Sequence, residues 1–91
     1  MLPPTKHSLK KLETLLGELG YTVRYEKGNF TSGYCLVEQR KVVIVNRFYD
    51  TEGRVGVLSE IAEHYRPTAE SPPLSGPSGK LLRQVQGGQK T

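Results

Sequence analysis

The stretch that decides the fold is Val42-Val43-Ile44-Val45, a run of four β-branched apolar residues. Such residues favour strands, and a strand without polar alternation is typical of one that is covered on both faces. A small sheet with helices on one side only would leave its other face in water. The run therefore leaves two interpretations open: either the helices lie on both faces of the sheet, or a second subunit covers one face.

Two further strands and a first helix are predicted before this run. Residues 21–26 alternate between apolar and polar side chains, which indicates a half-buried strand, and the apolar residues 34–37 form another. Residues 9–19 repeat leucine at helical spacing. Ser8 is the expected N-cap of this helix, and Gly20 its left-handed C-terminal stop.

A second helix is predicted after the run. Asp50 or Thr51 would cap it, and it would end before Pro67, because the residue before a proline avoids helical geometry. Residues 67–91 then contain four of the six prolines and few large apolar residues. That composition predicts disorder, with at most a transient helical turn near Leu81 and Leu82. We therefore expect that removing residues 68–91 leaves the thermal midpoint nearly unchanged.

These elements predict an α+β fold: a small α-β-β-β-α domain with a three-stranded, mainly antiparallel sheet and a disordered C-terminal tail. The expected organisation is an N-terminal arm (1–7), the domain (8–66) and a basic tail rich in Pro, Gly and Ser (67–91). From Arg66 onward, four Lys/Arg against one acid give +3 of the formal net charge of +4. The charge is thus concentrated in the tail, and no basic stripe marks the domain as a nucleic-acid groove.

The numbers of cysteines and histidines limit which disulfides and metal sites the chain can form. The single cysteine, Cys35, excludes an intrachain disulfide, and one Cys with two distant His cannot assemble a zinc cluster. A thiol in an apolar strand is expected to be inert.

The loop 27–33 could cradle a phosphate through its glycines and hydroxyls, or could simply connect two strands, and we expect no cofactor. With no long apolar run and no signal peptide, the expected location is cytoplasmic.

A candidate interface follows the third strand. Arg47, Phe48 and Tyr49 combine an arginine with two aromatics, a combination enriched at protein interfaces, and Val43 and Val45 would extend it onto the sheet. The alternatives are that Phe48 caps the core while Arg47 is solvated, or that these side chains stack on bases.

A second candidate site is Glu60, Glu63 and His64, near the end of the second helix. His64 could act as a base or metal ligand. The alternative is that it interacts with the helix dipole at the C-terminus while the two glutamates form a solvated face.

The order helix, three strands, helix, with Gly33-Tyr34-Cys35-Leu36 leading through Val42–Asn46 to the second helix, resembles the core of the ImmA/IrrE family of zinc-peptidase-like domains. The resemblance covers about residues 8–65 and implies that fold. The family's H-E-x-x-H motif falls on residues 59–63, where Ser59 and Glu63 replace the two histidines and only Glu60 matches. No catalytic residue, metal or cofactor is therefore carried over.

Residues 25–35 and 46–52 also resemble a group of short bacterial proteins, a resemblance that implies a family and brings no activity with it. The function expected from the sequence is a non-catalytic protein-interaction module acting as a homodimer, possessing no enzymatic activity. Two alternatives stay open: a nucleic-acid-binding accessory protein that uses the basic tail, and a degenerate metallopeptidase-like domain.

Overall fold

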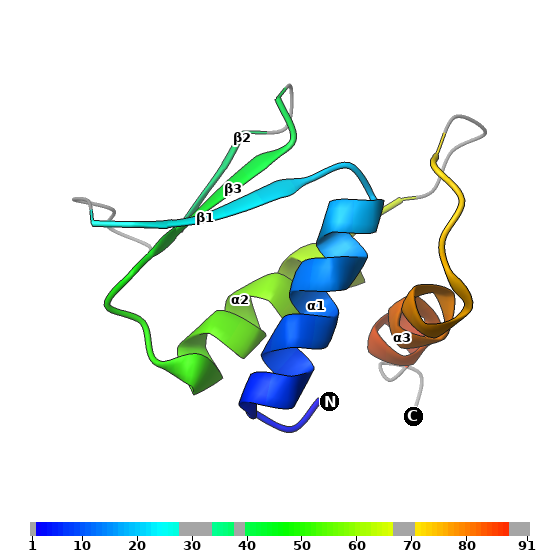
Figure 1. Cartoon of the computed structure of the whole chain (residues 1–91), viewed down its shortest axis with the longest axis horizontal. Helices are drawn as coiled ribbons and strands as arrows, with labels where there is room; N and C mark the ends of the chain where they lie inside the picture. Colours follow the sequence, from blue (N-terminus) through cyan, green and yellow to red (C-terminus); the bar gives the residue numbers. More distant parts are fainter. Residues whose placement is uncertain (1, 28–33, 38–39, 67–70, 88–91) are drawn as a thin grey trace.

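A computed structural model describes residues 2–27, 34–37, 40–66 and 71–87 of the chain. These residues form, in order, α1 (Lys6–Glu18), β1 (Thr22–Glu26), β2 (Tyr34–Val37), β3 (Val42–Asn46), α2 (Thr51–Glu63) and α3 (Gly76–Gly87) (Figure 1). The general α+β class is confirmed, and the first five elements lie close to their predicted positions. Predictions for the loop 28–33, and for the side chain of Cys35, lie outside the described part of the chain.

The sheet within the described residues is mixed, with strand order β1-β3-β2. β1 runs parallel to β3 in the register Thr22↔Val42 to Glu26↔Asn46, and β2 runs antiparallel to β3. The prediction of a mainly antiparallel sheet was therefore wrong. Apolar periodicity reports which face of a strand is buried, but it carries no information about which neighbour the strand pairs with. The β2–β3 pair uses one edge of β3 and leaves the other edge to β1.

Helices α1 and α2 lie together on one face of the sheet (Figure 1). Val43 and Val45 of the central strand are fully buried, in one core with Leu12, Leu16 and Leu58 of the two helices. Because side chains alternate along a strand, Val42 and Ile44 lie on the opposite face, where both are partly exposed. The interpretation that helices cover both faces of the sheet is therefore wrong for the described elements.

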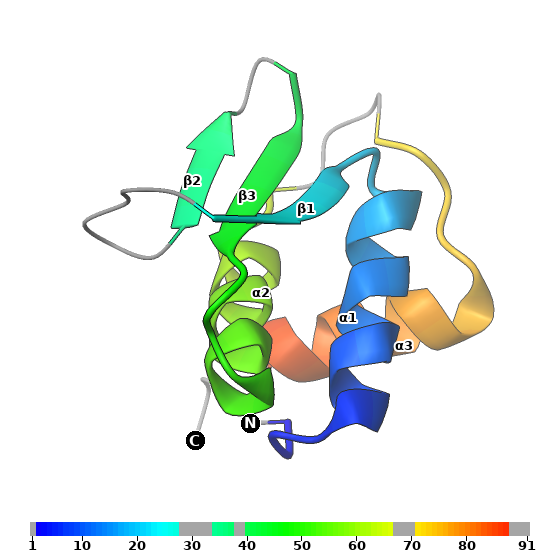
Figure 2. The ribbon, with the colours of Figure 1, turned by 60° about the vertical axis from the view of Figure 1, so that its left-hand side comes forward.

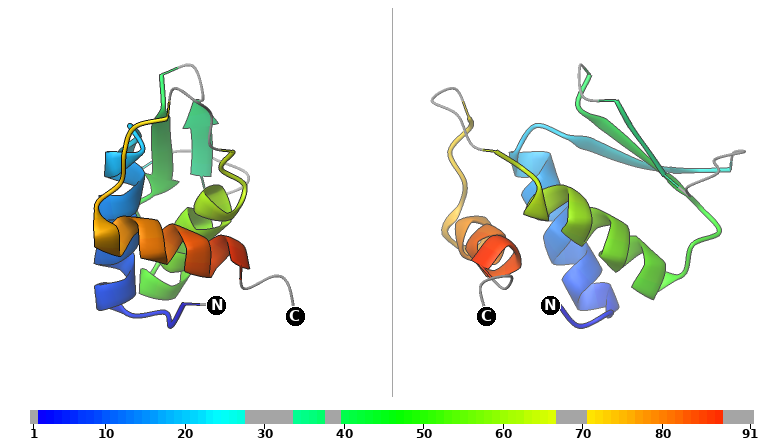
Figure 3. Two further views of the ribbon diagram at one scale, coloured as in Figure 1. Left: turned by 90° about the vertical axis from the view of Figure 1, so that its right-hand side faces the viewer. Right: turned by 180° about the vertical axis from the view of Figure 1, so that it is seen from behind.

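The third helix, α3, crosses α1 and α2 on their side away from the sheet (Figure 2). The right-hand view of Figure 3 shows α1 and α2 between α3 and the sheet. Leu81 and Leu82 are only 3% and 8% exposed. The prediction of a disordered tail was therefore wrong for this segment, because averaging composition over 25 residues masked the short apolar stripe that Leu81, Leu82 and Val85 form at helical spacing.

Hydrogen bonds between residues close in sequence determine where the helices begin. Thr5 caps α1 in place of the predicted Ser8, which is buried within the helix and donates its N–H to Thr5 Oγ1 at 3.2 Å. Gly20 has the predicted left-handed backbone, with a φ of 97°. Asp50 caps α2 by accepting the Gly53 N–H at 2.8 Å. Gly20 lies where the chain passes from α1 to β1, and Asp50 lies where it passes from β3 to α2.

Candidate functional site

The outer face of the sheet, defined here by Val42 and Ile44 of β3 with Thr22, Arg24 and Glu26 of β1, combines apolar and charged side chains. The parallel register sets Thr22 beside Val42 and Arg24 beside Ile44. Arg24 Nη2 lies 2.6 Å from Glu26 Oε2, one step further along the same face. The face thus has an apolar centre on β3 and an ion-paired border on β1.

Two residues of the predicted interface do not reach this face. Val43 and Val45 are 0% exposed and pack under the helices. A partner of the folded chain cannot contact them. Their neighbours Val42 and Ile44 are the residues of the same strand that a partner can reach.

The loop after β3 presents one aromatic side chain to solvent. Phe48 is 71% exposed, whereas Tyr49 packs partly against the core. The loop backbone is held by Arg54 of α2, whose Nε donates to the Tyr49 carbonyl at 3.0 Å and whose Nη2 donates to the Arg47 carbonyl at 2.8 Å. The Arg54 guanidinium also lies 4.4 Å from the centre of the Tyr25 ring, within the range of cation–π attraction.

Arg54 was not singled out from the sequence, although it determines how this loop is presented. An arginine in the first turn of a helix is normally a solvated residue, and its two carbonyl partners are visible only in the fold. Because Arg54 holds both sides of Phe48, the exposed ring sits on an ordered turn.

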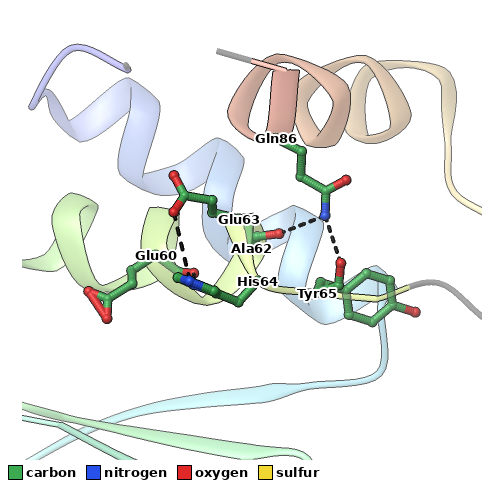
Figure 4. Close-up of polar contacts among 6 residues, drawn as sticks. All are labelled: Glu60, Ala62, Glu63, His64, Tyr65 and Gln86. Carbon is green, nitrogen blue, oxygen red and sulfur yellow. Dashed lines mark hydrogen bonds and ion pairs between the residues drawn. The ribbon is translucent and has the colours of Figure 1, made fainter. Parts of the chain in front are cut away.

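Glu60, Glu63 and His64 form the C-terminal end of α2 (Figure 4). His64 Nδ1 lies 2.9 Å from the Glu60 carbonyl oxygen, a contact that requires the proton on Nδ1, and its Nε2 lies 4.0 Å from Glu63 Oε1. Both are interactions of a helix end. In the described ranges, no group of three or more His, Cys, Asp or Glu side chains is placed to hold a metal ion.

The arrangement around α3 depends on two polar residues that the sequence did not indicate. At one end, Glu18 of α1 accepts hydrogen bonds from the Ser75 N–H (2.8 Å), the Ser75 hydroxyl (2.9 Å) and the Ser78 hydroxyl (2.7 Å). These hydrogen bonds, the Ser75 N–H foremost, lower the pKa of Glu18. At the other end, Gln86 Nε2 donates to the carbonyls of Ala62 and Tyr65 at 3.1 and 2.8 Å (Figure 4).

A groove lies between α1 and α3, with a cavity volume of about 150 Å³. We call it the α1–α3 groove. Its α1 side is formed by His7, Lys10, Lys11 and Thr14, and its α3 side by Pro77, Ser78 and Leu81.

Across the described ranges, no helix is both long enough and apolar enough to cross a bilayer. No protein-family model, curated protein or solved structure matches the chain. The two family resemblances drawn from the sequence therefore stay predictions.

Proposed function

We propose that this chain is a small, non-catalytic protein-interaction module that acts as a homodimer through the outer face of its sheet. The observation that carries the proposal is the placement of Val42 and Ile44, two apolar residues of the central strand, on the face that α1 and α2 leave open. A partner at this face would remove both side chains from water, which is the main favourable term in association.

The strand arrangement supports this proposal. Sheets built only of parallel strands are found almost always with both faces covered, and β1 and β3 give this mixed sheet one parallel pair. A third helix is present in the described part of the chain, and it packs against α1 and α2 instead of the sheet. Cover for the outer face would then come from a second copy.

The size of the outer face limits the expected affinity of the dimer. Three strands of about five residues span roughly 14 Å by 17 Å, from the usual spacing between strands and the rise per residue. That is smaller than the interface of a typical stable complex, which buries about 800 Å² on each partner. We therefore expect a weak dimer whose population depends on concentration, with the Arg24–Glu26 pairs at its border.

The experiment is light scattering over a wide concentration range, with wild type compared to Ile44→Lys. The wild-type mass should rise toward that of a dimer, while Ile44→Lys stays monomeric and keeps its circular dichroism. Gln84→Lys adds the same charge at an exposed position of α3 and serves as the matched control. A wild-type mass that stays monomeric throughout, or an Ile44→Lys mass that rises as the wild type does, contradicts the proposal.

Phe48→Lys addresses the other part of the predicted interface. If the loop belongs to the dimer contact, this substitution weakens association as Ile44→Lys does. If only Ile44→Lys has an effect, the contact is confined to the sheet.

A further inference from the structure

The first two turns of α1 carry an unusual concentration of positive charge. The charges are those of Lys6, Lys10 and Lys11, which are all exposed, and the first turn has no acidic residue. Cations near a helix N-terminus oppose the helix dipole, and Lys6 and Lys10 are like charges one turn apart. Departures from local stability rules of this kind tend to be found at functional sites.

The acids of α1 do not neutralise this charge. Glu13 accepts a hydrogen bond from the Tyr25 hydroxyl, and Glu18 is engaged with Ser75 and Ser78 of the α3 end. Among the described residues, no carboxylate lies within ion-pair distance of Lys10 or Lys11. As far as the described residues go, the rim of the α1–α3 groove is therefore cationic and open to an anionic partner.

The floor of the groove has a different character. Pro77 and Leu81 of α3 and Thr14 of α1 contribute apolar surface to it, in a volume of about 150 Å³. A cavity of that size accommodates a benzene-sized group, whereas pockets for drug-sized ligands measure about 300–1,000 Å³. The groove thus fits one apolar side chain with charged groups around it.

We infer that the α1–α3 groove binds a short acidic segment of a partner protein, which inserts one apolar side chain between α1 and α3 and sets its carboxylates against Lys10 and Lys11. A peptide satisfies both the apolar floor and the cationic rim. Inorganic phosphate or a nucleic-acid backbone would engage the rim and leave the floor in water. The site is separate from the outer face of the sheet and does not depend on dimer formation.

The first test is a nuclear magnetic resonance titration of the full-length chain. The probes are the capped peptide Glu-Glu-Leu-Glu-Glu and its counterpart Glu-Glu-Ser-Glu-Glu. We expect the leucine peptide to shift amide signals of residues 7–14 and 77–81. The serine peptide should bind about tenfold more weakly or worse, because one buried leucine side chain is worth at least that factor.

The second test is charge reversal on the rim. Lys10→Glu with Lys11→Glu should weaken binding of the leucine peptide by more than tenfold. Both positions are exposed and glutamate is about as good a helix former as lysine, so the variant is expected to fold. Lys80→Glu with Arg83→Glu makes the same change of charge at exposed positions of α3 that do not line the groove, and should change affinity by less than about threefold.

Three results would overturn the inference. Equal losses of affinity in the two double variants would show attraction by overall charge alone. Equal binding of the leucine and serine peptides would show that the floor takes no part. Tighter binding of a single-stranded oligonucleotide than of the leucine peptide, with the same signals shifted, would assign the groove to nucleic acid. If the double-Glu variant did not fold, Lys10→Gln with Lys11→Gln would replace it, with a smaller loss expected.

Discussion

Ser78 in the first turn of α3 donates its hydroxyl hydrogen to the carboxylate of Glu18 at the end of α1, over 2.7 Å and 60 positions of sequence. Ser75 is the N-cap of α3, since its Oγ accepts the Ser78 N–H at 3.4 Å, and the Glu18 carboxylate in turn accepts the N–H of Ser75. A negative charge there also complements the α3 dipole. With Gln86 bound to the end of α2, α3 is held by polar contacts at both of its ends.

Removing the negative charge of Glu18 should loosen α3. We expect Glu18→Gln to speed amide exchange in α3 more than in α1 or β3, because the charged acceptor of three hydrogen bonds becomes a neutral one. Hydrogen exchange followed by mass spectrometry checks this. Uniformly faster exchange, or no change in α3, would show that the Glu18 contacts do not hold the helix.

Acid should have the same effect on the wild type. The pKa of Glu18 is lowered in the folded chain, so its contribution to stability is fully present above its ordinary pKa of about 4.5 and is lost as the pH falls through the lower folded value. Exchange in α3 should therefore accelerate below about pH 4.5 once the intrinsic exchange rate is corrected for. In Glu18→Gln this added acceleration should be missing, and its persistence there would assign it to another group.

Gln86→Glu should destabilise the chain. Its Nε2 donates to the carbonyls of Ala62 and Tyr65. A carboxylate oxygen at this place cannot donate and would face two carbonyl oxygens that are also acceptors. Loss of buried hydrogen bonding costs about 1–3 kcal/mol, so the free energy of unfolding should fall by at least about 1 kcal/mol. Gln84→Glu, an exposed neighbour on the same helix, is the matched control in urea denaturation. Equal effects of the two substitutions would contradict the Gln86 contacts.

Removing α3 should now be costly, contrary to the expectation from composition. Leu81 and Leu82 are buried in the common core, and a chain ending at residue 70 would expose the helical face beneath them. Leu81→Ala alone should lower the free energy of unfolding by about 2–5 kcal/mol. Thermal denaturation of the truncated chain and of Leu81→Ala checks this, and an unchanged midpoint for either would mean that α3 does not pack as described.

Ionisation of Tyr25 should destabilise the folded chain at alkaline pH. Burial foremost, and then the hydrogen bond to Glu13, raise the pKa of Tyr25 well above its usual value of about 10. Its contribution to stability is therefore present below about pH 10 and is lost as the pH rises above that value. Tyr25→Phe should show a shallower alkaline decline in thermal midpoint. An identical decline would assign the alkaline loss to other groups.

Much of the secondary structure could be predicted from local patterns. The leucine spacing of α1, the left-handed Gly20 and the Asp50 cap of α2 are each determined by residues within a few positions of one another. The parallel pairing of β1 with β3 could not be predicted, since no local pattern encodes a strand's neighbour. The packing of α3 was missed for a related reason: its partners Glu18 and Ala62 are far away in the sequence.

The candidate site was predicted in part. The run 42–45 indicated a strand with apolar residues on both faces, and such residues are present on both. Which residues of this strand stay accessible depends on the face against which the helices pack. The helices bury Val43 and Val45, so the accessible residues are Val42 and Ile44. The contacts of Arg54 and the α1–α3 groove form only in the folded chain, so no local sequence pattern predicts them.

The central claim is that the outer face of the sheet is where two copies meet. Its most direct test is an isotope-filtered nuclear Overhauser measurement on a mixture of labelled and unlabelled chains, at a concentration where the mass has risen toward that of a dimer. We predict intermolecular contacts that involve the methyl groups of Val42 and Ile44. If the mass is that of a dimer and these methyl groups show only contacts within their own chain, the two copies meet elsewhere and the claim is contradicted.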